Sequence, residues 1–170
     1  ETAISAALTG HLVLSTLHTN SAAATITRLI QMGAPDYLIS STLTGISAQR
    51  LVRRLCPKCK VAYHATREEA MKVVANKEEI EQFMKRTIYK AKGCFDCKHE
   101  GYVGRLGVYE IMNVTKEIKK LIAQSAHDIE IEEAAVGAGM KTLQKSCLGH
   151  ILRGETTIDE FVRVLGTVTE

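Results

Sequence analysis

Four of the five cysteines in this chain form two closely spaced pairs, Cys56-Pro-Lys-Cys59 and Cys94-Phe-Asp-Cys97. Two residues between cysteines let a tight turn direct both thiolates at one ion, and a second such turn completes a tetrahedral set of ligands. Four thiolates form a closed, soft site, which suits Zn²⁺ in a structural role. We therefore predict that Cys56, Cys59, Cys94 and Cys97 bind zinc. Removal of the ion should loosen residues 56–101 and leave the C-terminal helices folded.

The alternative for a Cys-x-x-Cys pair is a redox-active dithiol, and a single pair would leave that interpretation open. Two matched pairs favour a metal site. The chain carries no recognisable export signal, so the cysteines indicate a reducing cytoplasm rather than disulfides. His64 and His99 lie near the pairs, but we interpret them as surface residues because four sulfur ligands already complete a site.

A second candidate for chemistry is His18, which begins a polar group shortly after the apolar run 12–14. An unbroken apolar run predicts a strand covered on both faces, as in a parallel sheet flanked by helices. Ligands bind beyond the carboxyl ends of such strands, and a helix capped by Asn20 or Ser21 would present its N-terminus to an anion. These features suit a phosphate, although the local pattern fits a surface or structural histidine equally well.

The elements that must position these residues follow from apolar spacing and caps. The spacing predicts helices over 2–8, 21–32 and 36–43, one or two helices over 67–86, and helical structure from residue 115 onward. Residues 88–89 and 106–112 are predicted to be extended, whereas 46–55 fits either a helix or a strand. Helix N-caps are predicted at Thr66, Asn76, Thr115, Asp128 and Thr157.

Composition limits the class of protein. The 170 residues are 45% hydrophobic and carry a net charge of +3, with no apolar run long enough to span a membrane. So mild a charge does not indicate a nucleic-acid-binding domain. The chain begins Glu1-Thr2-Ala3 without an initiating Met, and we expect it to be a piece of a longer protein.

Several motifs resemble those of the secretion ATPase superfamily, the hexameric motors of type II secretion and type IV pilus assembly. Thr9-Gly-His11 before the apolar run and Thr16-Leu-His-Thr-Asn20 after it resemble the His box of that family. Gly101-Tyr-Val-Gly-Arg105 and Val108-Tyr-Glu-Ile111 are also similar to family sequences. The two cysteine pairs resemble the assembly and secretion motors rather than the retraction motors.

The resemblance implies an α/β fold: the C-terminal portion of a RecA-like P-loop ATPase domain, with a tetracysteine zinc subdomain and a helical C-terminal region. It implies that residues 1–55, joined by a strand at 105–113, belong to the nucleotide domain. Residues 56–101 would form the zinc subdomain, and residues 114–170 the helical subdomain. The resemblance also favours a strand over 46–55.

The same resemblance implies roles for single residues. His18 would be the catalytic histidine that faces the γ-phosphate of ATP, and Arg28, Gln49 and Arg50 would contact the nucleotide. A solvated helix face and a basic rim are the alternative interpretation of those three. The cofactors of the full-length parent would be ATP and Mg²⁺. The Walker B segment would lie upstream, and no Gly-x-x-x-x-Gly-Lys-Ser/Thr loop occurs here, so this chain alone should not hydrolyse ATP.

The implied partners are other copies of the parent in a homo-hexamer and the inner-membrane platform protein of the pilus or secretion machine. The implied location is the cytoplasm, peripheral at the inner face of the membrane, without direct contact to nucleic acid. The alternative is a zinc-stabilised binding module without enzymatic activity. A basic cluster beside the first cysteine pair, which suits nucleic acid, supports it: Arg50, Arg53, Arg54, Lys58 and Lys60. The aromatic content of 5% counts against a base-stacking surface.

Overall fold

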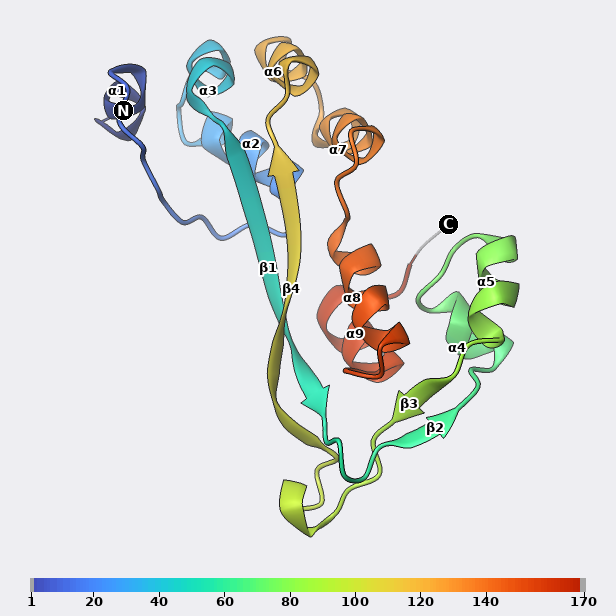
Figure 1. The fold of residues 1–170 in the computed structure, drawn as a ribbon. Coiled ribbons are helices and arrows are strands. Elements are labelled where there is room, and N and C mark those ends of the chain that lie inside the picture. The colour runs from blue at the N-terminus through green and yellow to red at the C-terminus, as the bar shows by residue number, and fades with distance from the viewer. Residues whose placement is uncertain (1, 169–170) are drawn as a thin grey trace. The chain divides into compact units, whose positions relative to one another are not determined.

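The computed structural model describes residues 2–168 as mixed α/β structure (Figure 1), and its contacts divide the chain into two compact units. The first unit comprises residues 1–48 and 110–142, and the second comprises residues 49–109 and 143–170. Each unit is therefore built from two separate stretches of sequence.

The first unit is a group of short helices. They are α1 (Thr2–Leu8), α2 (Ala22–Gln31), α3 (Asp36–Thr42), α6 (Lys116–Ala123) and α7 (Asp128–Gly137). Helix α3 packs on α6, and α2 packs on α7. The largest buried side chains of these helices are isoleucines, namely Ile26, Ile39, Ile118, Ile122 and Ile131. The helices predicted in this unit are thus confirmed, and all of them except α1 have buried residues.

The N-termini of these helices follow the predicted capping chemistry with one exception. The Ser21 side chain accepts a hydrogen bond from the amide of Ala24, and Thr115 accepts one from Ile118. Asp128 was predicted as an N-cap but is the first residue of α7, and His127 holds the N-cap position. The carboxylate of Glu130 accepts a hydrogen bond from the His127 amide, and the carboxylate of Asp128 accepts one from the amide of Ile129.

The predicted strand after α1 is wrong for this structure. Residues 11–19 have no regular secondary structure, and Figure 1 shows them as an irregular connection between α1 and α2. Leu12 and Leu14, which would share one face of a strand, are 84% and 87% exposed, and Val13, which would lie on the other face, is 37% exposed. A strand needs a neighbour to pair its amides and carbonyls. Within residues 2–168 the strands pair only with one another, so this run has no such neighbour.

The longest strands are β1 (Gly45–Leu55) and β4 (Tyr102–Asn113), which pair in a two-stranded sheet. Figure 1 shows that they run in opposite directions. The strand over 46–55 is therefore confirmed, as is the extended segment at 106–112, which begins earlier than predicted. The ambiguity of 46–55 has a physical origin. Ala48, Val52 and Leu55 are the buried residues of β1, and their spacing of four and three also fits a helix.

The second unit contains a small antiparallel sheet, β2 (Val61–Tyr63) with β3 (Ile88–Lys90), in which Val61 lies opposite Lys90. Helices α4 (Arg67–Met71) and α5 (Lys77–Met84) lie between these strands in the sequence. Thr66 and Glu69 form the predicted capping box of α4, and the Asn76 side chain caps α5. The unit is completed by a single 3-10 turn, η1 (Phe95–Cys97), and by helices α8 (Leu143–Leu152) and α9 (Ile158–Leu165).

Hydrogen bonds from the loop between α8 and α9 attach these helices to the strands. The amide of Leu55 donates to the carbonyl of Glu155 at 2.8 Å, and the Thr156 hydroxyl donates to the carbonyl of Arg53 at 2.8 Å. The hydroxyls of Tyr102 and Thr157 lie 2.9 Å apart. One of these bonds involves Leu55, the residue that precedes Cys56, so the loop between α8 and α9 is attached to the start of the cysteine segment.

Candidate metal centre and the histidine segment

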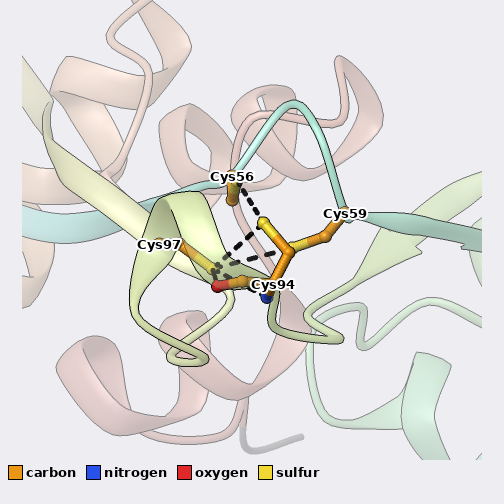
Figure 2. A group of neighbouring side chains, drawn as sticks. All are labelled: Cys56, Cys59, Cys94 and Cys97. Carbon is orange, nitrogen blue, oxygen red and sulfur yellow. Dashed lines mark hydrogen bonds between the residues drawn. The ribbon is translucent and has the colours of Figure 1, made fainter.

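The four paired cysteines converge on one point (Figure 2). Cys56 follows the end of β1, Cys59 lies in the turn before β2, Cys94 precedes η1 and Cys97 is its last residue. Their sulfur atoms all lie within 4.8 Å of one another. Individual Sγ–Sγ distances are 3.9 Å between Cys56 and Cys94, 3.8 Å between Cys59 and Cys97, and 3.7 Å between Cys94 and Cys97.

This geometry fits a tetrahedral metal ion. With metal–sulfur bonds of about 2.3 Å, the sulfurs of a tetrahedral site lie about 3.8 Å apart. These three Sγ–Sγ distances fall within 0.1 Å of that value. All four thiols are free rather than joined in disulfides. The cluster can therefore bind a metal, and its four thiolates leave no open position for a reacting water.

Backbone amides hold one of the sulfurs in place. The amides of Cys94 and Gly101 each donate a hydrogen bond to Sγ of Cys97 at 3.2 Å. Burial acts to raise the pKa of Cys97, but these donors outweigh it and lower the pKa to about 7. At Cys59 burial dominates and raises the pKa to about 11. Cys97 is thus better prepared than Cys59 to bind an ion as a thiolate at neutral pH.

Two glycines allow the second cysteine turn to close. Gly93 has φ of 98°, and a Cβ there would lie 2.5 Å from the carbonyl oxygen of His99. Gly101 has φ of 80°, and a Cβ there would lie 2.6 Å from the side chain of Ala91. Both positions need a left-handed backbone and a close approach that only glycine permits.

The other side chains near the pairs do not join the cluster. His64 and His99 are exposed, which confirms their interpretation as surface residues. Cys147 is fully buried in α8, where burial raises its pKa to about 12. Among residues 2–168, the cluster of potential metal ligands contains the four paired cysteines and nothing else.

A buried carboxylate that the sequence did not reveal supports the second unit. Glu160 at the start of α9 is completely buried and accepts hydrogen bonds from the Arg53 amide at 2.7 Å and from the Arg163 guanidinium at 2.6 Å. The Arg53 guanidinium binds the other carboxylate oxygen at 2.8 Å. Burial opposes the charge, but these donors lower the pKa of Glu160 to about 2. The predicted capping of α9 by Thr157 is confirmed, because its hydroxyl accepts a hydrogen bond from the Glu160 amide. The Glu160 side chain binds Arg53 on β1.

The residues expected to contact nucleotide are not brought together within one unit. His18 and Arg28 belong to the first unit, and both side chains are exposed. Gln49 and Arg50 belong to the second unit, where Arg50 donates to the carbonyl of Gln49 at 3.0 Å. Their roles stay predictions; within residues 2–168, the predicted site residues that lie together in a single unit are the four cysteines.

The helices of the described chain are short. None within residues 2–168 combines the length and apolar composition needed to cross a bilayer.

Comparison with known proteins shows similarity along almost the whole chain. A sequence model of the family described as "Type II/IV secretion system protein" matches residues 1–163. The chain is 42% identical over 164 residues to the type IV pilus assembly ATPase PilB of Acinetobacter baylyi. The aligned stretch covers 96% of this chain and 28% of that protein. It is 41% identical over 162 residues to the type II secretion system ATPase E of Vibrio cholerae, covering 95% of this chain and 31% of that protein.

A putative type II secretion system protein E of Escherichia coli is 42% identical over 168 residues, or 99% of this chain and 33% of that protein. The chain thus spans about a third of the length of the curated relatives that it matches. The similarity covers both compact units, including the cysteine segment.

Proposed function

Because this chain belongs to the type II/IV secretion system protein family, we propose that it is the C-terminal part of an ATP-driven motor for type IV pilus assembly or type II protein secretion. One observation carries the proposal. The family match is continuous over residues 1–163, and relatives similar over the same stretch are named as ATPases of these two processes. The activity would belong to the full-length parent.

In the parent, we propose, residues 1–55 and the strand at 105–113 belong to a RecA-like nucleotide domain. The exposed Leu12 and Leu14 support this proposal, since an exposed apolar run gains stability if neighbouring strands and helices bury it. His18 would then lie beyond the carboxyl end of that strand, where phosphates bind in open α/β sheets.

The proposed role of His18 is to donate a hydrogen bond from its imidazole to the γ-phosphate of ATP. Loss of the phosphate would then remove this hydrogen bond at the end of the strand. Its exposure in the first unit is compatible with this role. Arg28, Gln49 and Arg50 are proposed nucleotide contacts on exposed or half-exposed positions of α2 and β1. ATP and Mg²⁺ are the proposed cofactors of the parent. The 170 residues alone are expected to be inactive, because they contain no Walker A sequence.

At the cysteine cluster we propose Zn²⁺ in a structural role. Cys56, Cys59, Cys94 and Cys97 would hold the ion, which would cross-link the two ends of the segment that contains α4 and α5. The parent is further proposed to form a homo-hexamer and to bind an inner-membrane platform protein. It would work in the cytoplasm at the inner face of the membrane.

The alternative of nucleic-acid binding loses support from the basic cluster on which it was based. Arg53 binds Glu160, Lys58 binds Asp96 at 2.7 Å, and Lys60 donates to the carbonyl of Gly154 at 2.7 Å. These cations are engaged within the protein rather than aligned for phosphates.

Steady-state ATP hydrolysis by the purified full-length parent tests the proposed function. We expect hydrolysis by the parent and none by the 170-residue chain. A His18→Ala variant of the parent should lose at least about a hundredfold in kcat. A His64→Ala variant, which changes an exposed histidine of the second unit, is the matched control and should keep wild-type kinetics. A His18→Ala enzyme as active as wild type would refute the role of His18, and an inactive wild-type parent would refute the motor.

A further inference from the structure

Glu110 occupies an unusual position on β4. Val108, Glu110 and Met112 alternate along the strand as its buried residues, so a carboxylate lies on the face that otherwise carries apolar side chains. Glu110 is only 2% exposed. A carboxylate at such a position is rarely retained without a specific partner, because burial of its charge is costly.

The partner is the N-terminus of α2. Oε1 of Glu110 accepts a hydrogen bond of 2.7 Å from the amide of Ala22, the first residue of that helix. Ala22 is completely buried, so the bond is shielded from water. The amide is one of the donors that a helix N-terminus leaves without an intrahelical acceptor, and the helix dipole favours a negative charge there. The neighbouring Ser21 satisfies the amide of Ala24, so the helix has one local cap and one distant one.

The segment that carries His18 is attached to the same turn of α2. The Thr19 hydroxyl lies 2.7 Å from the Thr25 hydroxyl, and Thr25 also donates to the carbonyl of Ser21 at 3.1 Å. The residue next to His18 is therefore bonded to the first helical turn, and that turn is bonded to β4 through Glu110. All of these residues belong to the first compact unit.

We propose that Glu110 is a positioning residue for the proposed phosphate-sensing histidine: it fixes the first turn of α2, and through the Thr19–Thr25 bridge it fixes the backbone at His18. The inference rests on the proposed function. Glu110 does not touch the nucleotide. Its loss would let the His18 segment shift, and a small displacement of a group that acts on a reacting phosphate lowers the rate strongly.

The test compares variants of the full-length parent in steady-state ATP hydrolysis with varied ATP. Glu110→Gln keeps the shape and the acceptor oxygen of the side chain but removes the charge. We expect kcat to fall by about tenfold while KM for ATP changes by less than about twofold, since the segment acts on the reacting phosphate and not on nucleotide capture. Thr25→Val, which breaks the hydroxyl bridge within the same shape, should give the same split and serves if Glu110→Gln fails to fold.

Thr115→Ala is the matched control, because it removes the N-cap bond of α6 in the same unit without touching α2. It should lower the melting temperature and leave kcat unchanged. Combining His18→Ala with Glu110→Gln should cost no more than His18→Ala alone, because both changes remove one effect.

The inference is overturned if Glu110→Gln keeps wild-type kcat, if KM rises in proportion to the loss of kcat, or if the double variant loses the product of the two single effects. If His18→Ala lowers kcat and neither Glu110→Gln nor Thr25→Val does, this inference fails and the proposed function stands. If the wild-type parent does not hydrolyse ATP, the proposed function itself has failed.

Discussion

Glu160→Gln is the substitution for which the structure gives the clearest magnitude. The carboxylate is completely buried, and its pKa is lowered from 4.5 to about 2 by the arginine donors that outweigh its burial. One pKa unit corresponds to about 1.4 kcal/mol, so the charged form contributes about 3 kcal/mol to the free energy of unfolding at pH 7. Glutamine resembles the protonated form. The arginine side chains are 44% and 53% exposed, so water can solvate them in the variant and the loss should not exceed this figure by much.

Urea unfolding at pH 7 with metal present, followed by far-UV circular dichroism, measures the loss. Glu81→Gln is the matched control, because Glu81 binds Arg67 at 2.6 Å while both side chains are more than half exposed. A surface pair of this kind contributes about 0–1 kcal/mol. The reasoning is refuted if Glu160→Gln costs less than about 1 kcal/mol, or no more than Glu81→Gln.

The same charge predicts a pH dependence with a defined sign. The folded-state pKa is lower than that of the unfolded chain, so the stability that Glu160 contributes is complete above about pH 4.5 and disappears as the pH falls toward 2. The difference between wild type and Glu160→Gln should therefore shrink over that range. Comparing the two proteins at each pH cancels the titration of the other carboxylates and the loss of metal from the cysteines.

Two further predictions concern the cysteine segment. Removal of the metal with a chelator should raise the rate of amide hydrogen exchange in residues 56–101 by at least about tenfold. The exchange rate in α8 and α9 should rise by a similar factor, because the loop between these helices is hydrogen-bonded to Arg53 and Leu55. Unchanged exchange in α8 and α9 would support the three-part division expected from the sequence. Gly93→Ala should weaken metal binding, which competition with a colorimetric chelator measures. It should also lower the free energy of unfolding by more than about 2 kcal/mol, because the added Cβ would clash with the His99 carbonyl. Gly104→Ala is the control, because φ there is 72° but nothing lies within 4 Å, and equal effects of the two substitutions would contradict the role of the close contact.

Local features were predictable to the extent that a few neighbouring residues determine them. Thr66, Asn76, Thr115 and Thr157 all cap helices as expected, since the acceptor and the donor lie within three residues of each other. The group of four cysteines that could bind a metal was predictable because each turn needs only its own two cysteines and the residues between them. The apolar run at 12–14 shows where prediction from local sequence fails. Its composition is that of a buried strand, but a strand exists only beside another strand, and within residues 2–168 it has none.

By itself, the sequence determined which four cysteines could hold a metal, most of the helices and the family to which the chain belongs, because all three depend on short motifs. The tertiary structure alone decided what Glu160 and Glu110 do. Their partners, Arg53 and Ala22, lie 107 and 88 residues away. In the sequence, Glu160 has the pattern of an ordinary residue at the start of a helix, and Glu110 that of an ordinary residue in a strand. A buried carboxylate is stable only where hydrogen-bond donors compensate the cost of burying its charge. The fold supplies these donors from distant parts of the chain, so each glutamate links two segments that are far apart in the sequence.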